Sequence, residues 1–283
     1  MKAIIIAAGR GKRMKDLTAN SPKCLLEIDG KTIIQNALDH LRSLGVNDIA
    51  VVKGYLQDKI CLPDLTYYIN DNYLQNNILT SLFYAEKELS DDVIILYSDI
   101  IFEKKVVEKL IESKYDISLV TDVKWTSNYI ERYDHPIGEA EKVVFDEKFQ
   151  VQHIGKILQG NKKEPQGEFI GMLKLSTIGA ETLKKFYHSS KEKYKTGPFQ
   201  KADSFQNAYL TDIIQEMVDH SVVVHCVPIE NGWRELDTAE DFNKAKTFFK
   251  NKKARVISSL KKIPNSILLG LVKARNQMKN YTK

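Results

Sequence analysis

The chain has 283 residues and a formal net charge of +5 at pH 7, and it is long enough to bury a full core in one large domain, or in one domain with an appendage. It contains no apolar stretch of membrane-spanning length, and its N-terminus predicts a strand in place of a signal peptide. The three cysteines have no CxxC spacing and the six histidines no HExxH spacing, so we expect reduced thiols in a cytoplasmic protein.

The first apolar run, Ala3–Ala8, predicts a buried strand, because β-branched residues bounded by glycine favour that state. It leads into Gly9-Arg10-Gly11-Lys12-Arg13, where two glycines let backbone N–H groups approach a phosphate and three cations neutralise its charge. Lys23 follows after a short loop and can return to the same anion. We therefore predict a triphosphate cradle at the end of the first strand. An ordinary turn with solvated cations is the alternative.

The next elements predict a parallel sheet. Apolar residues at helical spacing over Ile33–Leu44 end at Gly45, and the run Asp48–Val52 follows as a second strand. A strand, a helix and a strand in this order form a unit with parallel strands. A short strand over Thr66–Ile69 and a helix over Asn77–Leu89 come next.

The strand predicted over Val93–Leu96 ends close to Asp99. Ligands of open α/β sheets lie beyond the carboxyl ends of the strands, so Asp99 is a candidate site residue. A helix over Lys105–Ser113 and a strand over Ile117–Val120 follow. The sequence then becomes mixed and polar, and we expect the pair His135-Pro136 only to shape a loop.

The second half of the chain predicts antiparallel strands and further helices. The whole pattern indicates the α/β class, with a Rossmann-like, mixed and mostly parallel sheet flanked by helices. We expect strands at Val143–Phe145, Val151–Ile157, Gly167–Leu175 and Ser221–Val227, helices at Glu181–Tyr187, Phe205–Asp219 and Ala239–Lys250, and a loop over Glu230–Asp237.

The C-terminal segment differs in charge from the rest of the chain. Residues 250–283 contain ten Lys or Arg and no Asp or Glu, so with a total of +5 residues 1–249 carry a net charge of −5. We predict a body over residues 1–249, without a nucleic-acid partner, and a basic amphipathic helical extension over residues 250–283. The apolar face of this helix is short, so we favour docking on its own body or on a homodimer partner. Contact with an anionic membrane is the alternative.

Two aspartates are candidate metal ligands. A triphosphate cradle beside carboxylates suits nucleotidyl transfer, in which an acceptor attacks the α-phosphorus and pyrophosphate leaves. Mg²⁺ supports such chemistry, since one or two carboxylates and the substrate phosphates bind it. Asp99 and Asp237 are the candidates, although Asp237 has an open alternative as the N-cap of the helix expected from Ala239.

Five elements of the sequence share the spacing of a known family: Ala7-Ala8-Gly9-x-Gly11-x-Arg13-Met14 with Leu17-Thr18 and Ser21-Pro22-Lys23, then Gly54-Tyr55-Leu56, Asn76-Asn77-x-x-x-Ser81, Asp99, and Glu235-x-Asp237. Over roughly residues 1–248 the chain resembles bacterial CTP:phosphocholine cytidylyltransferases and their relatives that activate 2-aminoethylphosphonate. Sugar-1-phosphate nucleotidylyltransferases share the first motif. The resemblance implies the nucleotide-diphospho-sugar transferase fold for a catalytic domain over residues 1–249, with CTP, Mg²⁺ and a small phosphorylated amine as ligands.

The resemblance also assigns roles to individual residues. Lys156 resembles the second lysine of the wider superfamily, which contacts the phosphate of the acceptor; a surface lysine on a hairpin is the alternative. The resemblance implies that Ala7, Ala8, Gly9, Gly11, Gly54, Asn77 and Ser81 bind the nucleotide, that Arg13, Lys23 and Lys156 bind phosphates, and that Asp99 and Asp237 hold Mg²⁺.

The acceptor pocket is expected in the less regular segments. An ammonium group is bound by aromatic faces and carboxylates, and each cation–π contact contributes about 0.5–2 kcal/mol. Trp125 and Trp233 have an alternative place in the core. The candidates for acceptor binding are Asp122, Trp125, Glu168, Tyr209 and Glu235.

Other functions require features that this chain lacks or presents differently. A sugar-1-phosphate nucleotidylyltransferase, the alternative that stays open, needs polar groups for hydroxyls in place of an aromatic and acidic cage. A glycosyltransferase would show Asp-x-Asp where this chain has Ser98-Asp99-Ile100, and an NAD-dependent oxidoreductase a third glycine in place of Met14. A nucleotide sensor has no need of Lys23 and two aspartates. We expect a CTP-dependent enzyme that serves cell-surface glycan or lipid decoration.

Overall fold

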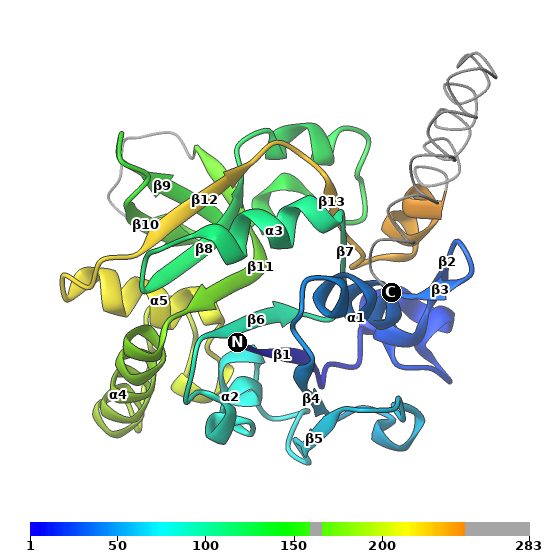
Figure 1. Cartoon of the computed structure of the whole chain (residues 1–283), viewed down its shortest axis with the longest axis horizontal. Coiled ribbons are helices and arrows are strands. Elements are labelled where there is room, and N and C mark those ends of the chain that lie inside the picture. The colour runs from blue at the N-terminus through cyan, green and yellow to red at the C-terminus, as the bar shows by residue number, and fades with distance from the viewer. Residues whose placement is uncertain (159–165, 247–283) are drawn as a thin grey trace, which may run out of the picture. The chain divides into compact units, whose positions relative to one another are not determined.

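Within residues 1–158 and 166–246, which the computed structural model describes, nine strands form a central mixed sheet (Figure 1). Residues Met1–Phe242 make one compact unit. The predicted boundary after residue 249 and the basic extension lie outside the described residues, so the two-part organisation stays a prediction. The strands are β1 (Lys2–Ala7), β4 (Asp48–Lys53), β5 (Thr66–Ile69), β6 (Val93–Tyr97), β8 (Ile117–Asp122), β9 (Lys142–Phe145), β10 (Val151–Gly155), β11 (Gly167–Leu175) and β12 (His225–Ile229).

One half of the sheet is parallel, and the strand β11 joins it to the other half. The strand order is β10-β9-β11-β6-β1-β4-β5, and β8 pairs with both β11 and β12. The strands β6, β1, β4 and β5 run parallel to one another, whereas β11 is antiparallel to β6, β8 and β9. This arrangement confirms the predicted α/β class with a mixed sheet flanked by helices.

Helices cover both faces of the sheet, and β1 is apolar on both sides for that reason. Ala3, Ile5 and Ala7 pack in one core cluster with α1 (Ile33–Ser43) and α3 (Lys104–Glu112). The alternate residues, Ile4 and Ile6, pack in a second cluster with α2 (Ile78–Phe83), α4 (Thr177–Lys193) and α5 (Leu210–Asp219). Successive side chains of a strand point to opposite faces, so a strand between two helix layers reads as a continuous apolar run.

Several helix bounds differ from the prediction because local caps decide them. The helix α2 stops at Phe83, and a separate 3₁₀ turn follows over Glu86–Glu88. The helix α4 begins early because the Ser176 side chain accepts a hydrogen bond from the Gly179 N–H at 3.2 Å. The helix α5 begins at Leu210, where the Asp212 side chain accepts a hydrogen bond from the Tyr209 N–H at 2.7 Å.

A short ribbon lies where the sequence predicts a loop. The strand β13 (Trp233–Glu235) pairs antiparallel with β7 (Ile100–Phe102), and the N–H of Leu236 donates to the Asp99 carbonyl at 2.9 Å. The strand predicted over Ser221–Val227 is also shifted along the chain, because β12 begins at His225, where its pairing with β8 starts. This ribbon carries the end of the body to the carboxyl end of β6, and so brings Asp237 beside Asp99.

Candidate active site

A cavity of about 380 Å³ opens beyond the carboxyl ends of β1 and β6. Most of the residues that the sequence points to line it, although they come from segments far apart in the chain. This position is the one where open α/β sheets bind their ligands. The predicted residues in its wall are Ala7, Ala8, Gly9, Gly11, Arg13, Lys23, Asn77, Ser81, Asp99, Lys156, Glu168, Tyr209, Glu235 and Asp237.

The turn after β1 has the backbone shape that its glycines allow. Gly11 lies at φ +64°, in the left-handed region that favours glycine, and caps the 3₁₀ helix Lys12–Thr18. A Cβ at Gly11 would stand 3.3 Å from a carbon of the Lys23 side chain. The Thr18 hydroxyl donates to the Gly11 carbonyl at 3.0 Å, which holds the turn closed. The glycine therefore leaves room for the buried lysine that crosses under the turn.

Gly54 lies behind this turn and does not line the cavity among the residues described. The N–H of Tyr55 donates to the Ala8 carbonyl at 3.0 Å, so the two segments run in close contact. A Cβ at Gly54 would come within 2.7 Å of the Ala8 carbonyl oxygen. Its place next to the nucleotide, which the family resemblance implies, stays a prediction; its geometry supports the cradle from behind.

Asn77 and Ser81 line the opposite side of the cavity from α2. The Asn77 side chain caps α2 by accepting from the Ile78 N–H at 2.8 Å, and it donates to the Asn207 carbonyl at 3.1 Å. The Ser81 hydroxyl accepts from the buried Asn70 side chain at 2.9 Å. The packing of these polar groups fixes this wall before any ligand binds.

Lys23 lies between the two aspartates that the sequence singles out. Its Nζ is 2.8 Å from an oxygen of Asp99 and 2.6 Å from an oxygen of Asp237, and only 7% of the residue is exposed. Burial alone would lower the pKa of Lys23, but the two carboxylates outweigh it and raise that pKa. The pKa of Asp237 is lowered despite its own burial, because Lys23, His135 and Arg13 surround it. Lys23 and Asp237 are therefore both charged at neutral pH.

The donor set around these aspartates fits a hard divalent cation. Both carboxylates reach one shared Lys23 ammonium, so they lie close enough to share a cation. The second oxygen of Asp99, Oδ1, is buried and has no hydrogen-bond partner among residues 1–158 and 166–246. Carboxylate oxygens are the protein ligands that Mg²⁺ prefers.

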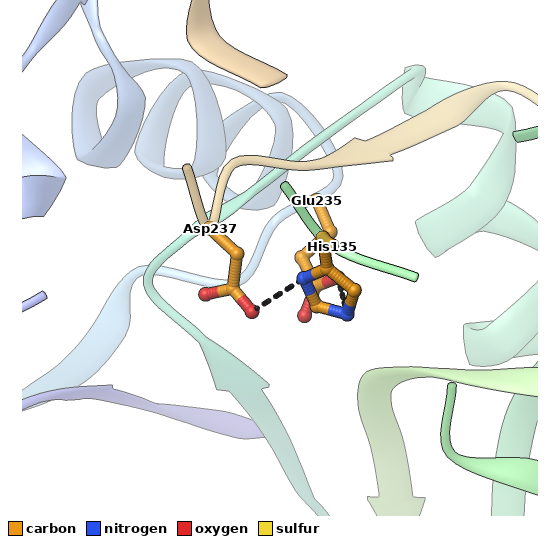
Figure 2. A group of neighbouring side chains, drawn as sticks. All are labelled: His135, Glu235 and Asp237. Atoms are coloured by element: carbon orange, nitrogen blue, oxygen red, sulfur yellow. Dashed lines mark ion pairs between the residues drawn. The ribbon is translucent and has the colours of Figure 1, made fainter. Parts of the chain in front are cut away.

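His135 is a buried member of the site that the sequence does not reveal. Its Nδ1 lies 3.2 Å from an Asp237 oxygen and its Nε2 3.8 Å from a Glu235 oxygen, and Figure 2 marks both pairs with dashed lines. One ligand atom from each of the three residues lies within 4.8 Å of the others, a grouping able to hold a metal ion. A lone histidine beside proline gives no sequence signal for this role, because its partners lie a hundred residues away.

A buried arginine fixes the segment that carries His135. The Arg132 guanidinium contacts Asp241 at 2.6 Å and Glu235 at 3.0 Å, and its pKa is raised because these carboxylates outweigh its burial. Asp241 also forms a reciprocal cap with Thr238: the Thr238 N–H donates to its carboxylate at 2.9 Å, and its own N–H donates to the Thr238 hydroxyl at 3.1 Å. Thr238 is therefore the N-cap of the helix that starts at 239, and Asp237 is left for the cavity.

We expect Arg132→Met to lower the free energy of unfolding by about 3–5 kcal/mol, because removing one partner leaves buried carboxylates uncompensated. Urea unfolding followed by circular dichroism measures it. Lys104→Met is the matched control, since its ion pair with Glu108 is solvent-exposed and should cost about 0–1 kcal/mol. Equal midpoints for the two variants would contradict a structural role for the Arg132 pair.

The far side of the cavity is rich in carboxylates. Lys156 pairs with Glu139 at 3.0 Å, and its Nζ stands 4.7 Å from the centre of the Tyr209 ring. Glu141, which no motif of the sequence marks, lines the same wall, and burial raises its pKa to about 7. Burial likewise raises the pKa of Glu168 to about 8. Buried acids of this kind are common at sites that bind cations or transfer protons.

Asp122 and Trp125 lie outside this cavity in the described part of the chain. The Asp122 carboxylate accepts from the Trp233 indole at 2.8 Å and from the Lys124 N–H at 2.9 Å, so it holds a turn together. Trp125 packs in a small cluster with Tyr129 and Ala140. Their assignment to the acceptor pocket stays a prediction without support from this geometry. Trp233 is buried in a core cluster, which agrees with the place in the core that the sequence left open for it.

The fold and the cavity define a nucleotidyltransferase: a glycine turn with cations after the first strand, and two aspartates sharing a lysine opposite it. Residues 3–137 match the family of MobA-like NTP transferase domains. The chain is 31% identical to the CTP:phosphoglutamine cytidylyltransferase of Campylobacter jejuni, over 85% of this chain and 97% of that protein. The chain therefore belongs to the same family of cytidylyltransferases as this enzyme.

Further comparisons agree in fold and length. The choline-phosphate cytidylyltransferase of Streptococcus pneumoniae is 27% identical over 89% of this chain and 99% of that protein. The solved CTP:phosphocholine cytidylyltransferase of S. pneumoniae superposes with a TM-score of 0.64 at 20% identity, over 88% of this chain and 98% of that one. The inositol-1-phosphate CTP transferase of T. maritima gives a TM-score of 0.66 at 23% identity, over 85% and 90% of the two chains.

Proposed function

We propose that this enzyme transfers the cytidylyl group of CTP to a small phosphorylated or phosphonate amine and releases pyrophosphate. An oxygen of the acceptor's phosphate or phosphonate forms the new bond to the α-phosphorus, and the bond from the α-phosphorus to the pyrophosphate oxygen breaks. The support for CTP and for such an acceptor comes from the named activities of the relatives, which include a 2-aminoethylphosphonate cytidylyltransferase of Lancefieldella rimae.

The single observation that carries the proposal is the position of Lys23. Both reactants are anions, so the enzyme has to offset their repulsion and align them. A buried ammonium between Asp99 and Asp237, with Arg13 bonded to Asp237, concentrates fixed charge at one point of the cavity. In our proposal Lys23 binds the α-phosphate and the incoming phosphate, Arg13 binds the leaving phosphates, and Lys156 orients the acceptor's phosphate.

We propose Asp99 and Asp237 as the residues that hold Mg²⁺, since their oxygens fit a hard cation. When bound, the ion neutralises phosphate charge and orients the triphosphate. The backbone from Ala7 to Gly11 is placed to bind the ribose and phosphates, and Gly54, Asn77 and Ser81 to surround the base.

The acidic far wall of the cavity favours an amine acceptor over a sugar phosphate. Sugar hydroxyls need groups that both donate and accept, whereas Glu139, Glu141, Glu168 and Glu235 place four carboxyl groups in that wall. Glu139 and Glu235 already pair with Lys156 and Arg132. A cation bound in this wall would draw Glu141 and Glu168, whose pKa values burial raises, into their carboxylate forms.

One panel tests the proposed function. We expect pyrophosphate release with CTP and a phosphorylated amine or 2-aminoethylphosphonate in the presence of Mg²⁺, at a rate well above that with ATP, GTP or UTP. Glucose-1-phosphate serves as the sugar control with each nucleotide. Release with glucose-1-phosphate and not with any amine would replace this proposal by the sugar-1-phosphate alternative.

The cellular setting is also part of the proposal. A cytoplasmic location is supported by three free cysteines, and a role in glycan or lipid decoration by the chemistry of a CMP-activated amine. Among the described residues, no helix combines the length and the apolar character that crossing a bilayer requires. The homodimer and the membrane contact predicted for residues 250–283 fall outside the described residues.

A further inference from the structure

Two buried polar atoms in the wall of the cavity have no partner. The Glu168 side chain is 3% exposed; its Oε1 accepts a hydrogen bond from the Tyr129 hydroxyl, but its Oε2 has no hydrogen-bond partner in the described ranges. The hydroxyl of Tyr97 is buried in the same way and also has none there. Both side chains line the cavity. A buried polar atom without a partner costs about 1–3 kcal/mol, so a bound ligand is the natural partner for both atoms.

The packing of neighbouring strands fixes both groups. Tyr97 is the last residue of β6, and Glu168 lies at the start of β11, which pairs antiparallel with β6. The Tyr97 ring meets Phe169 edge-on, with centroids 6.0 Å apart. Gly171 makes room for that ring, because a Cβ there would lie 2.4 Å from it, and its φ of +77° suits glycine. The hydroxyl is therefore held in place by a built site.

The charges around Glu168 favour a cationic ligand. Tyr129, Arg132, Asp122 and Glu141 are the titratable groups that act on it, and burial raises its pKa to about 8. Burial raises the pKa of Tyr97, and the charge of Glu141 acts in the same direction. A positive group placed among these residues would pair with the carboxylate form of Glu168.

The ring of Tyr209, which is expected to bind the acceptor, is already covered by another side chain of the protein. The Lys156 ammonium covers the Tyr209 ring at 4.7 Å while it pairs with Glu139. A trimethylammonium group depends on such open aromatic faces, because it has no N–H to donate. A primary ammonium carries three N–H donors and satisfies a carboxylate and a hydroxyl directly.

We infer that Glu168 and Tyr97 bind the N–H donors of the acceptor, and that the enzyme therefore selects a primary ammonium over a quaternary one. This inference rests on the proposed function, which leaves the kind of amine open. Neither Tyr97 nor the free oxygen of Glu168 has a part in binding the nucleotide in that proposal.

Phosphoethanolamine and phosphocholine test it, because they differ by three methyl groups on nitrogen. We expect kcat/KM with CTP to be at least about 100-fold higher for phosphoethanolamine, since a site built to hydrogen-bond N–H rejects an analogue without it. Tyr97→Phe should reduce this ratio about tenfold, and Glu168→Gln should reduce it further. Tyr68→Phe is the control, because its hydroxyl bonds to Glu88 away from the cavity, and it should leave the ratio unchanged.

Calorimetric binding of each phosphoamine without CTP separates this inference from the proposed function. Selective binding of phosphoethanolamine without any pyrophosphate release would support the amine site and refute the transfer reaction. Equal or stronger binding of phosphocholine, or binding of neither compound, would overturn the inference. A ratio that Tyr97→Phe and Tyr68→Phe change equally would overturn it as well.

Discussion

Lys23→Ala is expected to lower kcat by about 10²–10³-fold or more, the usual loss when one fixed charge or donor is removed from a transition state. The lysine is buried, and its charge is kept by two carboxylates at 2.8 and 2.6 Å, so no solvent cation replaces it at low cost. The effect should appear in kcat more than in KM for CTP, because the lysine acts on charge that develops during transfer. Pyrophosphate release under saturating CTP measures the loss.

The same substitution has a second consequence that does not depend on turnover. Without Lys23, the carboxylates of Asp99 and Asp237 face one another without their shared ammonium, so a divalent cation should bind there more readily. We expect Mg²⁺ to raise the melting temperature of Lys23→Ala more than that of the wild type. Lys174→Ala is the matched control: this lysine is also buried, but its ammonium donates to the Ser113 carbonyl far from the cavity. Wild-type turnover in Lys23→Ala would refute its assignment.

Much of the fold follows from local pattern. The apolar runs of β1, β4 and β6 are continuous because both faces of these strands are buried, and such runs predict parallel strands under helices. The bounds of α4 and α5 were less predictable, since they depend on the side chains of Ser176 and Asp212, whose hydrogen bonds to backbone N–H groups the sequence does not single out.

The site was predictable where it follows a strand end, and less so where distant segments meet. Arg13 and Asp99 lie within a few residues of the first and central strands, Lys23 follows the turn after the first strand, and all three line one cavity. Asp237 reaches them because β13 pairs with β7, and the sequence predicts a loop over Glu230–Asp237, where β13 lies. His135 shows the same limit, because its partners Glu235 and Asp237 come from the far end of the body.

Asp122 shows how a correct strand end can still mislead. Asp122 is the last residue of β8, and Asp99 comes shortly after the end of β6. Open α/β sheets bind ligands beyond the carboxyl ends of their strands, so both positions suit a ligand. However, β8 pairs with β12 and the antiparallel β11, and the Asp122 carboxylate at its end accepts from the Trp233 indole and does not line the cavity. The residue type and its position in a strand were visible in the sequence; the neighbours of the strand were not.

Asp99→Asn is expected to reduce turnover at least about a thousandfold, because the charge stabilisation that a bound metal gives is several kcal/mol and each 1.36 kcal/mol is a factor of ten. Asparagine keeps the shape of the side chain and its hydrogen-bonding oxygen, but it removes the negative charge that holds a divalent cation and Lys23. The buried Oδ1 without a partner in residues 1–158 and 166–246 marks the atom that should lose its ligand. Asp39→Asn, on the outer face of α1 with Lys31 and Gln35 as partners, is the control and should retain wild-type turnover.

A binding measurement tests the role of Asp99 apart from catalysis. Mn²⁺ as a paramagnetic probe, or Mg²⁺ by thermal shift, should bind the wild type in the presence of CTP and bind Asp99→Asn at least tenfold more weakly. If turnover falls while the affinity for the cation is unchanged, Asp99 acts by holding Lys23 and the metal site lies at His135, Glu235 and Asp237, whose ligand atoms also lie within 4.8 Å of one another. If both are unchanged, Asp99 has no part in the site, and the pairing of two aspartates across the β7–β13 ribbon is only structural.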